Sequence, residues 1–259
     1  MRLPIFQVDA FTDRPFAGNP AAVMPLAQWL PDQVLQSIAR ENNLSETAFF
    51  VPEGEGYRIR WFTPGGEVDL CGHATLASAW VILTELQPAL KQVQFLSRSG
   101  PLGVGRDGNL LSMDFPSRPP GPIPAPAGLE EALGVKPLET WQSRDLVAVL
   151  DSEAAVRGLR PDMSGILRLE VFGLTVTARG EDADFVSRFF APGLGVPEDP
   201  VTGSAHCTLV PFWAGRLGRN RLRALQVGPR GGELFCELKG ERVAIAGRAV
   251  TVLEGTFIL

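Results

Sequence analysis

The chain has 259 residues, of which 45% are hydrophobic and 20% charged, and its formal net charge at pH 7 is −5. This balance is typical of a globular protein and excludes an intrinsically disordered chain. The sequence has no dense run of Lys and Arg, so it lacks the positive surface that phosphate backbones require. We therefore expect neither nucleic acid nor a membrane surface as a partner.

No apolar stretch is long enough to span a bilayer. The longest mainly apolar run, residues 74–83, is far shorter than the roughly 20 residues that a transmembrane helix needs. The first residues lead to no signal-peptide core. We expect a cytoplasmic protein of either two modest domains or one large one.

The first half of the chain predicts strands and two helices. Alternating apolar residues predict a strand at 5–11, and strands are also expected at 47–51 and 57–62. Helical spacing after a proline predicts a helix at 31–41. Residues 74–86 contain neither Gly nor Pro and are apolar on all sides, which indicates a helix buried by a surrounding sheet.

A proline-rich segment follows. Residues 117–128 hold five prolines, a composition that favours extended geometry without regular pairing, so we expect an interdomain linker there. Beyond it, strands are expected at 146–150, 167–178 and within 222–259, with a helix at 182–190.

The Gly-x-Gly-x-x-Gly pattern at 103–108 is not expected to bind a nucleotide. The residues after it predict a hairpin turn into a strand, whereas a dinucleotide-binding loop must open a helix.

Two histidines, His73 and His206, are the only ones in the chain, and a cysteine lies beside each. These are ligand types for zinc, but Cys71-x-His73 and adjacent His206-Cys207 do not let both side chains turn to one ion, so we expect no metal site. A racemase that uses Cys71 and Cys207 as opposed bases remains an alternative, although Cys207 would fall inside a helix.

A short pattern occurs twice, about half a chain apart. His73 and His206 each open His-x-Thr-Leu-x-x-x-Trp, which suggests a duplicated domain whose helix entrance is repeated. A second register pairs Gly72 with Gly203 and therefore His73 with Ser204. In either register, a glycine before an apolar helix offers backbone N–H groups to a carboxylate or oxyanion.

Simpler interpretations exist for three polar residues. Thr202 and Ser204 are suitable as ordinary helix caps. Glu46 begins an apolar strand, where an acid is usually solvated; if it is buried instead, desolvation raises its pKa and suits it to carry a proton. The segment after Asp199 lacks the Gly-x-Ser-x-Gly turn of a serine hydrolase.

Four motifs in the same order and spacing resemble those of the phenazine-biosynthesis isomerase family. They are Val8-Asp-Ala-Phe-Thr-Asp-Arg-Pro-Phe-Ala-Gly-Asn-Pro20, Asn43-Leu-Ser-Glu-Thr-Ala-Phe49, Cys71-Gly-His-Ala-Thr-Leu76 and Glu198-Asp-Pro-Val-Thr-Gly-Ser-Ala-His206. The resemblance covers nearly the whole chain.

The resemblance implies an α+β, diaminopimelate-epimerase-like fold with two pseudo-symmetric domains, each a curled, mostly antiparallel sheet around a central helix. It implies an N-terminal domain at 1–116 completed by residues 247–259, a C-terminal domain at 117–246, and an active site in the cleft between them. A homodimer is expected from the resemblance alone.

The resemblance also implies an isomerase without metal or cofactor. The family's phenazine member moves a proton within a dihydro-hydroxyanthranilate through one glutamate, which by position is Glu46 here, so the expected partner is a small carboxylated metabolite. The catalytic partners carried over are His73, Asp199 and Ser204. The residues expected to bind substrate are Asn19, Gly72, Thr202 and Gly203.

Two alternatives stay open. One is a two-base amino-acid epimerase, which the resemblance puts in doubt because no cysteine stands in the second half at the place that matches Cys71. The other is a non-catalytic protein of the same fold that binds a small metabolite.

Overall fold

The computed structural model describes all 259 residues, which divide into two compact units. Unit 1 consists of Met1–Asp114 and Ala246–Leu259, and unit 2 of Phe115–Ile245. Each unit has its own mixed sheet and its own long buried helix. None of the helices is long and apolar enough to cross a membrane.

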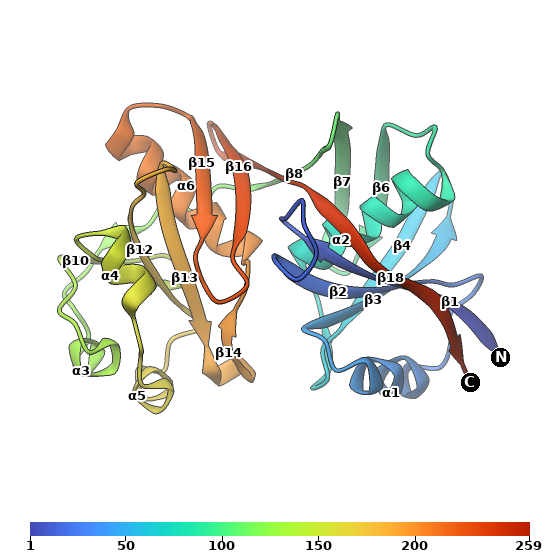
Figure 1. Cartoon of the computed structure of the whole chain (residues 1–259), viewed down its shortest axis with the longest axis horizontal. Helices are drawn as coiled ribbons and strands as arrows, with labels where there is room; N and C mark the ends of the chain where they lie inside the picture. Colours follow the sequence, from blue (N-terminus) through green and yellow to red (C-terminus); the bar gives the residue numbers. More distant parts are fainter. The chain divides into compact units, whose positions relative to one another are not determined.

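Unit 1 is built on a sheet in which β18 lies beside β1 and the order continues β2, β3, β4, β6, β7 and β8 (Figure 1). Pairs β2–β3 and β4–β6 are parallel, and the others are antiparallel. The short strand β5 pairs with β4. The strands are β1 (Arg2–Ala10), β2 (Asn19–Pro25), β3 (Glu46–Glu53), β4 (Gly56–Phe62), β5 (Glu67–Val68), β6 (Gln92–Ser97), β7 (Gly100–Asp107), β8 (Leu110–Pro116) and β18 (Ala249–Ile258).

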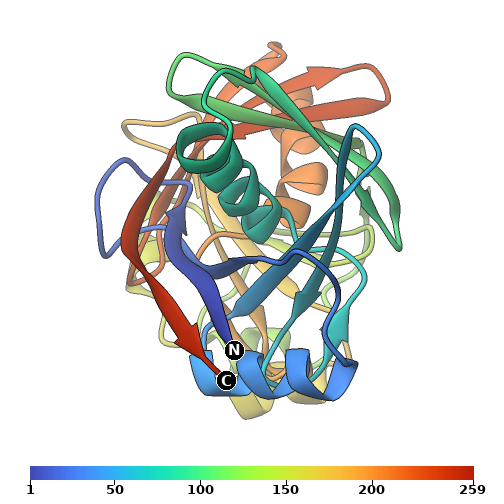
Figure 2. The ribbon, with the colours of Figure 1, turned by 90° about the vertical axis from the view of Figure 1, so that its right-hand side faces the viewer.

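The central helix of unit 1, α2 (Gly72–Val81), is buried on nearly all sides, as its sequence predicts. It packs on β1, β2, β3 and β18, and Figure 2 shows it lying against these strands. It continues into a turn of π-helix, η1 (Ile82–Leu86). The second helix, α1 (Asp32–Asn42), buries its Leu35 and Ile38 against β3 and β4.

Unit 2 repeats this plan. Its sheet runs β10, β11, β12, β13, β15 and β16, with β11–β12 and β13–β15 parallel and with β14 paired to β13. The strands are β9 (Gly121–Pro122), β10 (Glu139–Gln142), β11 (Leu146–Val149), β12 (Leu174–Arg179), β13 (Phe185–Ala191), β14 (Val196–Asp199), β15 (Arg221–Gln226), β16 (Gly232–Lys239) and β17 (Arg242–Gly247). The helices are α3 (Leu129–Leu133), α4 (Glu153–Gly158), α5 (Met163–Arg168), η2 (Pro192–Leu194) and α6 (Gly203–Leu217).

The two sheets are equivalent strand by strand. Strands β1, β2, β3, β4, β6 and β7 correspond to β10, β11, β12, β13, β15 and β16, with parallel pairs at the same two places. In both units a short strand, β5 or β14, comes directly before the buried helix. This arrangement confirms the predicted α+β fold of two pseudo-symmetric halves.

An arginine–glutamate pair fixes the short strand in each unit. Arg60 of β4 holds Glu67 of β5 with Nε–Oε1 and Nη2–Oε2 distances of 2.7 and 2.8 Å. Arg188 of β13 holds Glu198 of β14 at the same two distances. Arg188 also donates to the carbonyl oxygens of Val156 and Leu159 and is 6% exposed. The repeated bidentate pairs therefore hold the segment that leads into each helix.

The helix starts decide the register of the repeat. Because α2 begins at Gly72 and α6 at Gly203, His73 corresponds to Ser204. Cys71 and Thr202 then occupy the same position before the helix. The register that made His206 equivalent to His73 was wrong, since His206 lies two positions deeper in its helix.

Three further sequence expectations need correction. The helix expected at 182–190 is strand β13, whose aromatic and β-branched residues are buried on both faces. The segment 117–128 lies within unit 2, and its β9 pairs with β10, so prolines did not prevent pairing. In the strand expected at 167–178, only the part from Leu174 onward is extended.

The Arg188–Glu198 pair should matter far more to stability than an exposed pair. We expect Glu198→Gln to lower the free energy of unfolding by about 3 kcal/mol, because the buried Arg188 loses its partner. Glu53→Gln, which breaks the exposed pair with Arg58, should cost far less, because water screens that pair. Urea denaturation followed by tryptophan fluorescence measures both; equal losses would contradict the role given to the buried pair.

Candidate active site

The predicted site residues form two groups, one in each unit, and each group gathers at the start of the buried helix. In unit 1 they are Asn19, Glu46, Gly72 and His73; in unit 2 they are Asp199, Thr202, Gly203 and Ser204.

In unit 1, Glu46 contacts His73. Glu46 is the first residue of β3, where it pairs with Ala21 of β2, and His73 is the second residue of α2. The Glu46 Oε2 atom lies 3.0 Å from His73 Nε2, and the two side chains are only 17% and 7% exposed. Glu46 is therefore a largely buried acid with a specific partner, and the simpler interpretation of a solvated loop residue was wrong.

The other ring nitrogen of His73 has two neighbours. Asn19, the first residue of β2, places its Nδ2 3.2 Å from His73 Nδ1, and Cys71 Sγ lies 3.5 Å from the same nitrogen. When the ring is neutral, Nδ1 accepts from the Asn19 amide; when it is charged, the Cys71 sulfur can accept the Nδ1 hydrogen. In both states Nε2 carries a hydrogen, and this nitrogen lies 3.0 Å from Glu46 Oε2 without the alignment of a hydrogen bond. His73 can thus gain or lose a proton at Nδ1 while Nε2 stays in contact with the carboxylate.

Burial and charge act in opposite directions on this group. Burial opposes the charged imidazole, whereas the charged form of Cys71 and the Glu46 carboxylate favour it; the balance raises the pKa of His73 above 6.5, and while the thiol is neutral the carboxylate alone supplies the negative charge. Burial, aided by the negative charge of Glu46, raises the pKa of the Cys71 thiol above 9. At neutral pH the thiol therefore stays protonated and is a poor base.

One atom each from Glu46, Cys71 and His73 lies within 4.8 Å of the others, and all three residue types can ligate a metal ion. Cys71 approaches Nδ1 and Glu46 approaches Nε2. An imidazole ligates an ion through one nitrogen, but Cys71 and Glu46 lie at different nitrogens of the ring. The arrangement therefore fits polar contacts on both sides of the imidazole better than three ligands around one ion.

In unit 2, neither predicted hydroxyl caps the helix. Thr202 stands at the cap position of α6 but makes no capping bond. Its Oγ1 donates to Asp199 Oδ2 at 2.5 Å. Ser204 lies inside the first turn, where its Oγ accepts from Nη2 of Arg144 at 3.0 Å. The capping interpretation was therefore wrong, and both hydroxyls are engaged with charged side chains.

Two residues of this group were missed by the sequence reasoning. Arg144 is paired with Asp145, which is 1% exposed, and reaches Ser204. Gln226, the last residue of β15, hydrogen-bonds to both Asp199 and Thr202. Neither lies in a motif of the sequence: Arg144 is in the turn between β10 and β11, and Gln226 reaches the site because β15 pairs with β13.

His206 and Cys207 belong to the core of α6. His206 is fully buried, and its Nδ1 donates to the Thr202 carbonyl oxygen at 2.8 Å. Burial lowers the pKa of His206 to about 4. Burial also raises the pKa of Cys207 to about 11, and Cys207 Sγ lies 3.9 Å from the Gly203 carbonyl oxygen. These contacts support structural roles for both residues.

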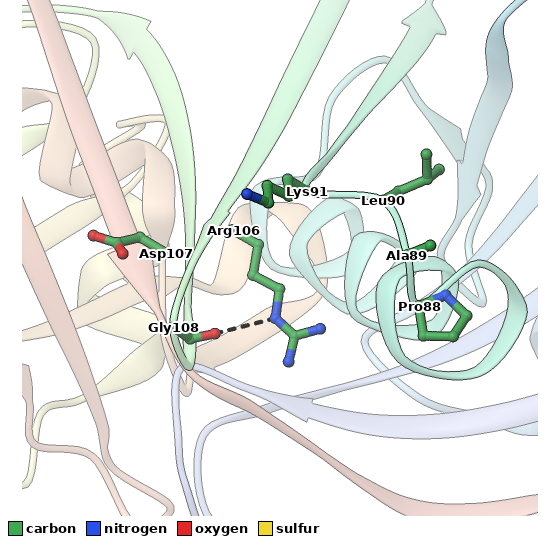
Figure 3. Close-up of a pocket in the computed structure, with 7 residues that line it drawn as sticks. All are labelled: Pro88, Ala89, Leu90, Lys91, Arg106, Asp107 and Gly108. Atoms are coloured by element: carbon green, nitrogen blue, oxygen red, sulfur yellow. Dashed lines mark hydrogen bonds between the residues drawn. The ribbon is translucent and has the colours of Figure 1, made fainter.

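A separate surface pocket lies in unit 1, between the end of η1 and the β7–β8 turn (Figure 3). Arg106 spans it and donates to the carbonyl oxygens of Leu83 and Gly108. The pocket contains none of the predicted site residues. The turn at 107–109 joins two strands, which confirms that the glycine pattern there does not open a helix. Its lining residues are Pro88, Ala89, Leu90, Lys91, Arg106, Asp107 and Gly108.

Comparison with known proteins identifies related sequences over the whole chain. Residues 8–255 match the family described as phenazine biosynthesis-like protein. An uncharacterised isomerase of Pseudomonas aeruginosa is 54% identical over 100% of both chains. A second, from Halalkalibacterium halodurans, is 45% identical, again over the full length of both. These relatives support an isomerase- or epimerase-type function.

Solved structures agree with this result. The phenazine biosynthesis protein of this family from Enterococcus faecalis has a TM-score of 0.98 and 49% identity, with complete coverage of both chains. A hydroxyproline epimerase from Agrobacterium vitis has a TM-score of 0.63 at 10% identity, over 98% of this chain and 92% of its own. The epimerase shares the fold alone.

The low pKa of His206 predicts a pH-dependent loss of stability. Between about pH 6.5 and 4 the unfolded chain binds the proton that the folded chain excludes, so folding weakens as the pH falls, by about 3 kcal/mol in total. The free energy of unfolding, measured by urea denaturation from pH 7 to 4, should fall more steeply in the wild type than in His206→Gln. Parallel curves would show that His206 is not the group excluded from protonation.

Proposed function

The chain belongs to the phenazine biosynthesis-like protein family, and on that premise we propose that it is an isomerase that moves a proton within a small conjugated carboxylate. Glu46 carries the proton in the proposed reaction, which needs no metal or cofactor. The observation that carries the proposal is the 3.0 Å contact between Glu46 and the buried His73. This contact involves one of the two carboxylate oxygens, and the Glu46 side chain remains 17% exposed.

In the proposed reaction Glu46 removes a proton from a carbon whose C–H bond is acidified by conjugation. The electron pair spreads through the conjugated system, and Glu46 returns the proton to a second carbon of the same molecule. His73 keeps its Nε2 in contact with Oε2, and this contact orients the carboxylate and limits its freedom. Atoms and charge balance within the substrate and Glu46 alone.

The helix starts are the proposed binding elements for the substrate's polar groups. The first-turn N–H groups at Gly72 and at Gly203 have no side-chain cap and suit a carboxylate or a developing oxyanion. Because Ser204 Oγ already accepts from Arg144, its own hydrogen is available to donate. We propose that Asp199 accepts from a substrate amino or hydroxyl group, and that Asn19 acts through His73.

The two-base epimerase is less well supported by the site. Burial keeps the Cys71 thiol protonated at neutral pH. The matching position of the repeat holds Thr202, so a second thiol base is missing there. The deuterium-exchange experiment below distinguishes the isomerase from a non-catalytic binding protein.

Deuterium incorporation from D2O into dihydro-hydroxyanthranilate tests the proposal. We expect exchange by the wild type, and a loss of at least about 100-fold in Glu46→Gln, because the amide cannot take the proton. Cys71→Ser should keep most of the activity. Glu55→Gln, the same change at an exposed turn residue, is the matched control and should behave as the wild type.

The opposite pattern, with exchange lost in Cys71→Ser and kept in Glu46→Gln, would favour the thiol epimerase. No exchange by the wild type, together with saturable binding of the same compound, would favour the binding protein.

A further inference from the structure

Gln226 makes hydrogen bonds that can orient Asp199 and Thr202. It is the last residue of β15 and is 1% exposed. Its backbone position is fixed on both sides, since it pairs with Ser187 of β13 and with Gly232 of β16. The side chain therefore leaves a rigid part of the sheet and reaches the segment between β14 and α6.

The amide of Gln226 makes three contacts, all with Asp199 or Thr202. Its Oε1 accepts from the backbone N–H of Thr202 at 2.8 Å. Its Nε2 donates to the Asp199 carbonyl oxygen at 2.6 Å and to Thr202 Oγ1 at 3.2 Å. These bonds hold both ends of the segment 199–202, which carries one predicted catalytic residue and leads into the helix.

The third contact has a directional consequence. Because Nε2 is a donor, Thr202 Oγ1 must accept from it, and the hydroxyl hydrogen is then directed elsewhere. It is directed to Asp199 Oδ2, 2.5 Å away. A hydrogen bond of this kind favours the charged form of a carboxylate over the neutral one.

We infer that Gln226 is a positioning residue that acts on Asp199 through Thr202: it holds the Thr202 hydroxyl so that Asp199 stays an ionised acceptor for the substrate. This role rests on the proposed function of Asp199. The adjacent Glu198 is paired with Arg188, and none of the variants below changes either residue.

Carboxyl ¹³C NMR of Asp199 tests this without any turnover. Thr202→Val should raise the titration midpoint of Asp199 by about one pH unit, since it removes a hydrogen bond to the charged form. Gln226→Leu, which is close in size, should give at least half of that shift. Gln142→Leu, the same change at an exposed position of unit 2, should give none.

The double variant separates positioning from general support. If Gln226 acts through Thr202, adding Gln226→Leu to Thr202→Val produces no further shift, because the hydroxyl that it orients is gone. The inference is overturned if Gln226→Leu shifts the Asp199 midpoint as much in the Thr202→Val background as in the wild type. It is also overturned if Gln226→Leu alone causes no shift. If Gln226→Leu does not fold, Gln226→Asn, which withdraws the amide by one methylene, replaces it with the same expected direction.

Failure of the Gln226 inference can be distinguished from failure of the proposed function. The expected shifts together with a wild type that exchanges no deuterium would leave the Gln226 contact chain established and the isomerase proposal refuted. Absent shifts with normal exchange would refute the role of Gln226 alone.

Discussion

Each unit depends on one apolar helix buried against its sheet. Helices α2 and α6 are covered along most of their length. The segment before each helix is fixed by a bidentate arginine–glutamate pair with the same geometry in both units. The predicted site residues of each unit therefore gather at the same place in the fold, the start of the buried helix.

The repeated frame carries different residues in its two copies. Where unit 1 has Cys71 and His73, unit 2 has Thr202 and Ser204. The first pair contacts a largely buried carboxylate, and the second is held by Arg144, Asp199 and Gln226 in a network of hydrogen bonds. In the proposed function, the residues of unit 1 move the proton and those of unit 2 bind polar groups of the substrate.

The sequence was sufficient for much of the fold because its signals are local. The apolar run after Gly72 predicted a buried helix, and the helix is there. Strand β13 was mistaken for a helix because residues buried on both faces lose their alternation. The true register of the repeat depended on where α6 starts, and the His-x-Thr-Leu pattern, which falls at different depths in the two helices, concealed it.

The site shows the same limit more sharply. Motif resemblance placed Glu46 and His73 together, and their contact is present. Arg144 in the β10–β11 turn and Gln226 at the end of β15 are far from Ser204 and Thr202 in sequence, so only the folded sheet brings them into contact. A residue such as Gln226, whose proposed role is to orient the Thr202 hydroxyl, leaves no pattern along the chain.

The central claim is that His73 is a charged imidazolium beside Glu46 at neutral pH. Because the chain has only two histidines, ¹⁵N NMR of the imidazole rings across a pH titration measures it directly. The account predicts that His73 is doubly protonated at pH 7 and loses a proton only well above 6.5, while His206 stays neutral until near pH 4. A His73 ring that is neutral at pH 7 and titrates at or below 6.5 would contradict it.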